Sequence, residues 1–281
     1  MFRYEQIPKD TFVVPSARPV FLEGDRQDAA VLFLHGYTGQ SADFLFLAQR
    51  LNALGLTVHV PRLPGHGTNR NDFRRTGWRD WLRRSIDAYL DLRSRYGEIY
   101  LGGLSMGGLL AIILAAQFPV ARLALFAPAL AVAHPMIRWT PILRYLVPPF
   151  SVSPKEEYDD PGLQHLAVHY WNERRPVQIA SVQRLITIAR HSLHGITAPV
   201  LTIVSEADQT VPSLAADLVE HRVRSEILRT VRLERSGHVV TAGIEKERVA
   251  TEIIRWFVPA SDFRPDEGYP NDDDTQSNNP G

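Results

Sequence analysis

Residues 100–108 read Tyr-Leu-Gly-Gly-Leu-Ser-Met-Gly-Gly and lie between two apolar runs. The run before them is typical of a buried strand, and the run after them, 109–116, consists of helix-forming residues. Gly103 to Gly107 fits the pattern G-x-S-x-G, a sharp strand-to-helix turn that holds its serine in a strained backbone conformation. The stretch therefore predicts an accessible Ser105 hydroxyl at a strand end, although a plain glycine-rich turn also fits the pentapeptide alone.

Strands and helices alternate on both sides of this turn. Short apolar runs typical of strands occupy 29–34, 57–60, 99–101, 122–126, 199–204 and 228–233. Helical patterns occupy 41–54 (with Ser41 as N-cap), 78–96, 107–118, 212–222 and 244–258. Residues 11–22 look extended and predict an edge strand or hairpin, with Pro15 and Pro19 limiting its ladder. The order predicts an α/β fold with a mostly parallel sheet and helices on both faces.

The alternation breaks between residues 128 and 195. This stretch is rich in proline and aromatic residues at first and irregularly helical later, so we expect it to be a cap inserted into the core. The core would then comprise residues 1–127 and 196–260. Residues 261–281 are rich in Asp, Asn and Pro, and we expect a disordered acidic tail.

The overall charge of the chain is balanced, but its distribution is not. The 281 residues have a formal net charge of zero, which predicts no general attraction to nucleic acid. The stretch from Arg62 to Arg84 carries seven arginines against Asp72 and Asp80. This run is interpreted as a solvated surface, with a rim that attracts anionic substrates as the alternative.

The sequence contains no cysteine, which excludes disulfides, thiolate chemistry and cysteine-based metal sites. The N-terminus lacks the apolar segment of a signal peptide, and no apolar run reaches the roughly 18 residues of a membrane span. We therefore expect a cytoplasmic protein without a membrane span. His165 and His169 are four residues apart, but Leu166 stands where a zinc-protease motif needs glutamate, so no metal is predicted.

A serine hydroxyl becomes a good nucleophile when a histidine takes its proton and an acid orients that histidine. The strand at 199–204 is followed by Glu206 and Asp208, and the strand at 228–233 is followed by His238. The carboxyl ends of parallel strands share one edge of the sheet, so these residues can converge on Ser105. We predict Ser105, Asp208 and His238 as catalytic residues, with Glu206 as the competing acid.

Acyl transfer also needs donors for the charge that develops on the substrate oxygen. One is expected to be the backbone N–H of Met106, directly after the serine. The other is expected from the loop after the strand at 29–34, where the N–H of Tyr37 follows His35 and Gly36. Gly36 would let the backbone approach, and the His35 ring would brace the loop.

With these residues in place, the chain resembles the α/β-hydrolase family over residues 11–258, and within it the bacterial carboxylesterase and monoacylglycerol lipase branch. The motifs that carry the resemblance are 35–39, 61–68, 103–108, Asp208 with Val211-Pro212, and 236–238. The resemblance implies a Ser105, Asp208, His238 triad, an acyl-enzyme intermediate, no cofactor, and a cap over an apolar acyl pocket. It predicts a small-molecule ester as the binding partner and leaves the oligomeric state open.

The expected reaction is hydrolysis of carboxylic esters with an apolar acyl chain. An acyl-CoA thioesterase, a C–C bond hydrolase of ring-cleavage products and a cofactor-independent perhydrolase would use the same triad. A non-catalytic binding scaffold is disfavoured, because each catalytic position holds a competent residue.

Overall fold

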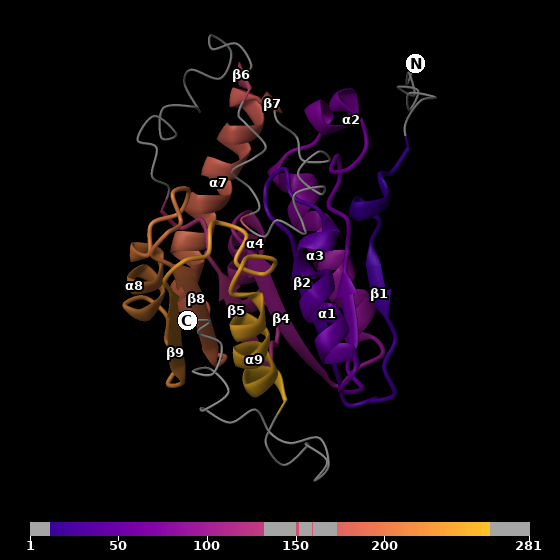
Figure 1. The fold of residues 1–281 in the computed structure, drawn as a ribbon, viewed down its shortest axis with the longest axis vertical. Helices are drawn as coiled ribbons and strands as arrows, with labels where there is room; N and C mark the ends of the chain where they lie inside the picture. Colours follow the sequence, from indigo (N-terminus) through magenta and orange to yellow (C-terminus); the bar gives the residue numbers. More distant parts are fainter. Residues whose placement is uncertain (1–11, 132–149, 152–158, 160–172, 259–281) are drawn as a thin grey trace, which may run out of the picture.

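A seven-stranded sheet forms the centre of the structure. The computed structural model describes residues 12–131, 150–151, 159 and 173–258. The strands lie in the order β1-β3-β2-β4-β5-β8-β9, and β1 is antiparallel to β3 while the other neighbours are parallel (Figure 1). Their bounds are Val20–Leu22 (β1), Ala29–Leu34 (β2), Thr57–Val60 (β3), Glu98–Leu104 (β4), Arg122–Phe126 (β5), Val200–Ser205 (β8) and Leu228–Leu233 (β9). The predicted, mostly parallel α/β sheet is confirmed.

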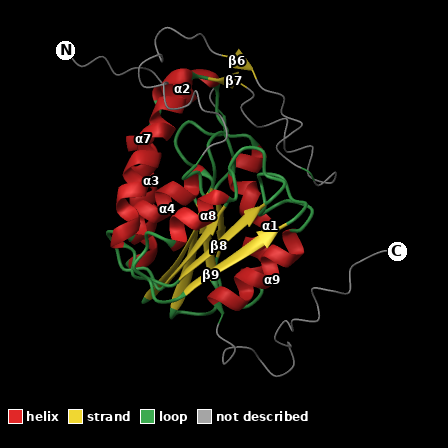
Figure 2. Ribbon diagram, turned by 90° about the vertical axis from the view of Figure 1, so that its left-hand side faces the viewer, coloured by secondary structure: helices red, strands yellow, loops and turns green. Residues whose placement is uncertain are grey.

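Helices cover both faces of this sheet (Figure 2). One face carries α3 (Trp78–Arg93), α4 (Met106–Ala115), α7 (Pro176–Ser192) and α8 (Leu214–Glu220), and the other carries α1 (Leu45–Asn52) and α9 (Lys246–Phe257). The short helix α2 (Arg70–Arg75) precedes α3, and a separate two-stranded pair is formed by β6 (Phe150–Ser151) and β7 (Glu173–Arg174).

The core follows from the apolar pattern of the central strands. All six residues of β2 are buried, and its side chains alternate between the two faces. Leu32 and Leu34 pack in the cluster under α3 and α4, whereas Val31 and Phe33 pack in the cluster under α1 and α9. Helix α4 is buried at all ten positions, as expected for a helix that is apolar all round.

The strand order places one point of the sheet edge at a topological switch. The chain goes from β2 through α1 to β3 on one side, then crosses through α3 on the opposite face to β4 on the other side of β2. In such sheets the loops after the two central strands diverge and leave a crevice at their carboxyl ends. Those loops are 35–38 after β2 and the turn at Ser105 after β4.

The first part of the chain differs from the prediction in three places. The edge-strand alternative is borne out, since β1 lies at the edge of the sheet beside β3, but the strand is shorter than predicted because a 3-10 turn (Pro15–Ala17) precedes it. Ser41 is not a helix cap; a 3-10 turn already begins there, and the N–H of Gln40 donates to Asp43 Oδ2 at 3.0 Å. Helix α2 was not predicted, since its six residues are too short to show a periodic pattern.

Much of the expected cap lies outside the described residues, which leave out 132–149, 152–158 and 160–172, and the expected tail lies outside them as well. The cap boundaries at 128 and 195 and the acidic tail therefore stay predictions. Within the cap range, α7 buries Leu185, Ile186 and Ala189 in the same cluster as α3 and α4. None of the helices described is long and apolar enough to cross a membrane.

Candidate active site

Ser105 occupies a strained turn between β4 and α4. Its backbone has φ 55° and ψ −114°, in the positive-φ region that non-glycine residues rarely adopt. The turn is held on both sides, because Ser105 N–H donates to Phe126 O at 2.9 Å and Ser105 O accepts from Ala129 N at 3.2 Å. The side chain is thereby lifted to the carboxyl edge of the sheet, as the pattern G-x-S-x-G predicts.

The two glycines of this pattern are required by close backbone approaches. A Cβ on Gly103 would lie well inside 3.0 Å of the Gly107 carbonyl, and a Cβ on Gly107 well inside 3.0 Å of Leu34 O. The obstructing atoms are backbone atoms, which cannot turn aside as a flexible side chain would. The turn therefore packs against itself and against the end of β2.

Gly107→Ala is expected to destabilise the protein by about 3 kcal/mol or more, because the new methyl group forces the end of β2 and the start of α4 apart. The check is urea unfolding. Gly97→Ala is the matched control, since a Cβ there meets Asp28 O at 3.4 Å and needs no shift. Equal stability of the two variants would contradict this account of the turn.

The three residues predicted from separate loops form one hydrogen-bonded chain. His238 Nε2 lies 2.9 Å from Ser105 Oγ, and His238 Nδ1 lies 2.7 Å from Asp208 Oδ2. The Asp208 side chain is fully buried, and that of His238 is 12% exposed. The loops after β4, β8 and β9 thus bring together residues that are 30 and 133 positions apart.

Asp208 is held as a carboxylate. Burial raises its pKa, but the hydrogen bond from His238 and those from Thr210 and Val211 N–H lower it, and the net pKa lies below the usual value. A carboxylate only accepts hydrogen bonds, so His238 Nδ1 carries a proton toward it. In the neutral ring Nε2 is then an acceptor, and Ser105 Oγ–H donates to it.

Glu206, the competing acid, does not take part in the hydrogen bonds that join Ser105, His238 and Asp208. Glu206 Oε2 accepts from Ser213 Oγ at 2.9 Å, and Glu206 Oε1 pairs with Arg232 at 3.2 Å. Both of its oxygens are thus engaged on the far side of the loop. The structure places Asp208, and not Glu206, against the imidazole.

The loop that carries His238 is fixed by a second carboxylate. Glu245 Oε2 accepts from the N–H groups of Arg235 at 3.0 Å and Ser236 at 2.8 Å, and from Ser236 Oγ at 2.9 Å. Burial raises the pKa of Glu245, but these bonds outweigh it and hold the pKa below the usual value. Asp159 Oδ2 accepts from Gly237 N at 2.6 Å, so the residue next to His238 is held as well.

The loop after β2 runs directly beside Ser105. A Cβ on Gly36 would lie 3.4 Å from Ser105 Cβ and 4.0 Å from Ser105 Oγ, so the backbone entering Tyr37 passes within contact distance of the serine. Met106 is the first residue of α4, and the first N–H groups of a helix have no partner within it. The two N–H groups predicted as oxyanion donors therefore belong to backbone that flanks Ser105 on either side.

Two buried histidines connect this loop to the loop after β3. His35 Nε2 accepts from Leu63 N at 3.1 Å, and His66 Nε2 accepts from Thr38 N at 3.1 Å. Their Nδ1 atoms face the carbonyls of Gly36 and Pro64, and the two rings meet edge to face at 4.9 Å. Each ring thus braces the other's loop, and both must be neutral to accept at Nε2.

This arrangement predicts a loss of stability in mild acid. Burial lowers the pKa of His35 from 6.5 to about 4, and burial also lowers the pKa of His66. The unfolded chain then binds more protons than the folded chain between these pH values. The stabilisation is fully present above pH 6.5 and is lost as the pH falls toward 4, by roughly 3 kcal/mol for His35.

Urea unfolding between pH 7 and 4 measures this effect. His35→Gln keeps an acceptor but has no titrating ring, so it should flatten the slope of the free energy of unfolding against pH. His194→Gln, at an exposed histidine, should leave the slope unchanged. If the wild type and His35→Gln lose stability in parallel, the neutral histidine pair is not the cause.

Several residues of the site were not predicted from the sequence. The bracing role of His66, the Glu245 carboxylate and Asp159 belong to this group. His66 lies in the 61–68 motif, but nothing in the neighbouring sequence indicates that its ring reaches the loop after β2. Glu245 and Asp159 accept hydrogen bonds from backbone N–H groups, and such contacts cannot be predicted from a pattern of side chains.

No metal-binding cluster is found among the residues that the structure describes, meaning three or more His, Cys, Asp or Glu side chains placed to hold an ion. His165 and His169, the two histidines four residues apart, lie outside those residues.

Known proteins with similar sequences point to one family. A family model described as "Alpha/beta hydrolase family" matches residues 31–251. A thermostable monoacylglycerol lipase of Bacillus sp. (strain H-257) is 30% identical over 258 residues, which cover 90% of this chain and 97% of that protein. A carboxylesterase of Bacillus subtilis (strain 168) is 26% identical over 248 residues, covering 87% and 97%.

Solved structures with the same fold include a metagenome-derived lipolytic enzyme from a study of LipS and LipT. It superposes with a TM-score of 0.78 at 27% identity and covers 86% of this chain and 98% of its own. A monoacylglycerol lipase of Paleococcus ferrophilus superposes with a TM-score of 0.73 at 20% identity, covering 85% and 96%. The second similarity concerns the fold alone.

Proposed function

The chain belongs to the alpha/beta hydrolase family and is a carboxylic ester hydrolase, and we propose that it works through a Ser105, His238, Asp208 triad. The observation that carries this proposal is the chain of two hydrogen bonds from Ser105 Oγ to His238 and from His238 to Asp208. Such a chain is what a serine nucleophile needs, because the hydroxyl must lose its proton as it attacks.

In the first half of the reaction, Ser105 Oγ attacks the ester carbonyl and His238 Nε2 takes its proton. The imidazolium formed is stabilised by the Asp208 carboxylate at Nδ1. The backbone N–H groups of Tyr37 and Met106 hold the negative charge on the substrate oxygen. His238 then gives the proton to the leaving alcohol, and an acyl group stays on Ser105.

In the second half, a water molecule takes the place of the alcohol. His238 removes a proton from this water, which attacks the acyl-enzyme and releases the carboxylic acid. The proton returns to Ser105 Oγ, so the enzyme ends in its starting state. The net reaction consumes one water and one ester and needs no cofactor.

We further propose that the substrates are esters with an apolar acyl chain, such as monoacylglycerols or simple alkyl esters. The relatives described as a monoacylglycerol lipase and a carboxylesterase, which align over nearly their whole length, support this class. So does the apolar and aromatic composition of residues 128–161, the first part of the stretch 128–195 that is expected to cap the acyl pocket.

A panel of purified substrates tests the proposal. We expect hydrolysis of 4-nitrophenyl esters to be faster for medium or long acyl chains than for acetate, and monoacylglycerols to be cleaved as well. Acyl-CoA thioesters belong in the same panel. No hydrolysis of any ester at any chain length would contradict the proposed function.

A further inference from the structure

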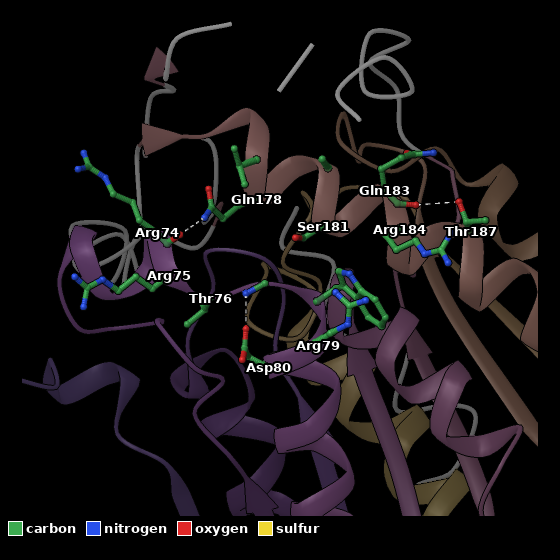
Figure 3. A pocket seen from close by; sticks show the side chains of 14 residues that line it. Arg74, Arg75, Thr76, Arg79, Asp80, Gln178, Ser181, Gln183, Arg184 and Thr187 are labelled. Atoms are coloured by element: carbon green, nitrogen blue, oxygen red, sulfur yellow. Dashed lines mark hydrogen bonds between the residues drawn. The ribbon is translucent and has the colours of Figure 1, made fainter. Parts of the chain in front are cut away.

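A groove of about 750 Å³ lies between the α2–α3 junction and α7 (Figure 3). This volume is within the range of pockets that hold small molecules. The described residues that line it come from two segments: Arg74, Arg75, Thr76, Gly77, Trp78, Arg79 and Asp80 on one wall, and Val177, Gln178, Ala180, Ser181, Gln183, Arg184 and Thr187 on the other.

The groove is strongly cationic. Figure 3 shows Arg74 and Arg75 toward one end and Arg79 and Arg184 toward the other. Among its described lining residues Asp80 is the one carboxylate, and Asp80 Oδ2 already accepts from Gly77 N at 2.9 Å. Four arginines and one carboxylate thus line the described part of the groove, and Arg79 and Arg184 lie together toward one end of it.

The walls are joined by a buried polar contact. Gln178 is only 2% exposed, and its Nε2 donates to Arg74 O at 2.8 Å, which ties α7 to the end of α2. Gln178 Oε1 is buried without a hydrogen-bond partner in the described structure. Such an acceptor normally has a donor, so a ligand with a hydroxyl or amino group beside its anionic part would satisfy it.

One of the guanidinium groups is oriented by an aromatic ring. The Arg79 guanidinium carbon lies 4.5 Å from the centre of the Trp78 ring. A guanidinium stacked in this way keeps its N–H edge available for a bidentate contact with an anion.

The groove adjoins the candidate active site through an aromatic layer. Phe73 and Trp81 flank the 74–80 wall in sequence, and their rings lie 5.7 Å and 6.1 Å from the Tyr37 ring. Tyr37 belongs to the loop that runs beside Ser105. One layer of side chains therefore separates the cationic groove from the loop proposed to hold the oxyanion.

We propose that this groove binds phosphate carried by the leaving group of the substrate. The inference rests on the proposed function, because it assigns a substrate class to the same site. Planar guanidinium groups match phosphate oxygens in pairs, and Arg79 and Arg184, which lie together toward one end of the groove, offer two such groups to one phosphate. A phosphorylated leaving group also places its negative charge away from the apolar acyl chain, on the rim rather than in the acyl pocket.

The source of the phosphate is either a phosphorylated glycerol or the nucleotide part of an acyl-CoA. Two matched pairs of substrates separate them: 1-lauroylglycerol against 1-lauroylglycerol 3-phosphate, and lauroyl pantetheine against lauroyl-CoA. Within each pair the acyl chain and the bond to be cleaved are the same. All four are assayed below their critical micelle concentrations at low and high salt.

The wild type should cleave at least one phosphorylated member with a kcat/KM about tenfold or more above its neutral partner, through a lower KM. High salt should remove much of this advantage, because exposed charges are screened. Arg79→Gln/Arg184→Gln should abolish the advantage and leave the neutral members unchanged. Both arginines are exposed, so the variant should fold normally.

Arg222→Gln/Arg224→Gln is the matched control. It removes the same two charges from exposed positions after α8 and should keep the preference. Binding of glycerol 3-phosphate and of ADP to Ser105→Ala, measured by calorimetry, gives a readout that needs no turnover. At least one should bind, and binding should weaken with Arg79→Gln/Arg184→Gln and not with the control pair.

Each outcome decides one proposal. If neutral esters are cleaved but phosphate gives no advantage in either pair, the groove proposal is wrong and the proposed function stands. An advantage that the Arg222/Arg224 control loses equally would reflect net charge and would also overturn the groove proposal. Failure to cleave any of the four substrates would contradict the proposed function itself.

Discussion

Ser105→Ala is expected to lower kcat for ester hydrolysis by about 10⁶, to near the limit of detection. The substitution removes the atom that attacks the carbonyl and leaves the rest of the site in place. Alanine keeps the Cβ, so the turn at φ 55° and its backbone contacts with Phe126 and Ala129 are unchanged. Steady-state kinetics with a 4-nitrophenyl ester of medium chain length measures the effect.

The fold should survive this substitution. The free energy of unfolding should not fall, because the hydroxyl is a functional group in a strained turn rather than a part of the core. A variant that is inactive and also unfolded would say nothing about nucleophilicity, so circular dichroism and urea unfolding accompany the assay. A folded variant with substantial activity would contradict the role of Ser105.

Asp208→Asn is expected to lower kcat by about 10⁴ with little change in KM. An asparagine placed against His238 offers an N–H donor where the carboxylate had accepted a hydrogen bond from Nδ1–H. The imidazole then turns to the tautomer that protonates Nε2, and that nitrogen can no longer accept from Ser105 Oγ. The loss of the carboxylate also removes the stabilisation of the imidazolium.

Glu206→Gln is the matched control for this prediction. It removes one carboxylate from the same loop, but Glu206 pairs with Ser213 and Arg232 instead of His238. Its kcat should stay within about twofold of the wild type, because exposed ion pairs contribute little. If Glu206→Gln inactivates the enzyme and Asp208→Asn does not, the assignment of the acid is wrong.

The central strands could be predicted from sequence because they are buried on both faces. The runs 29–34 and 122–126 coincide with β2 and β5. The bounds of the edge strand β1 were harder to predict, because β1 has only three residues and its partner β3 is distant in sequence. The observed helix ends also differ from the predicted ones, because caps depend on side-chain hydrogen bonds such as the one that Asp43 accepts from Gln40 N–H.

The candidate catalytic residues could be predicted because a parallel sheet brings its strand ends to one edge. Asp208 and His238 follow strands whose carboxyl ends share that edge with Ser105, so their approach could be expected without any contact information. The shared sheet edge does not indicate which residues hold the loops around the site in position. His66 acts on a loop 28 residues earlier in the chain and Glu245 on backbone nine residues earlier, and only the fold brings their acceptor atoms to the N–H groups of Thr38 and Ser236.

If Ser105 forms a covalent acyl-enzyme, a reagent that modifies nucleophilic serines should label it. The protein is incubated with an alkyl fluorophosphonate, and the adduct is located by mass spectrometry of the intact chain and its peptides. We expect one adduct per chain, on Ser105, together with complete loss of esterase activity. We expect no adduct on Ser105→Ala. An adduct on another residue that abolishes activity, or full activity with Ser105 labelled, would contradict this expectation.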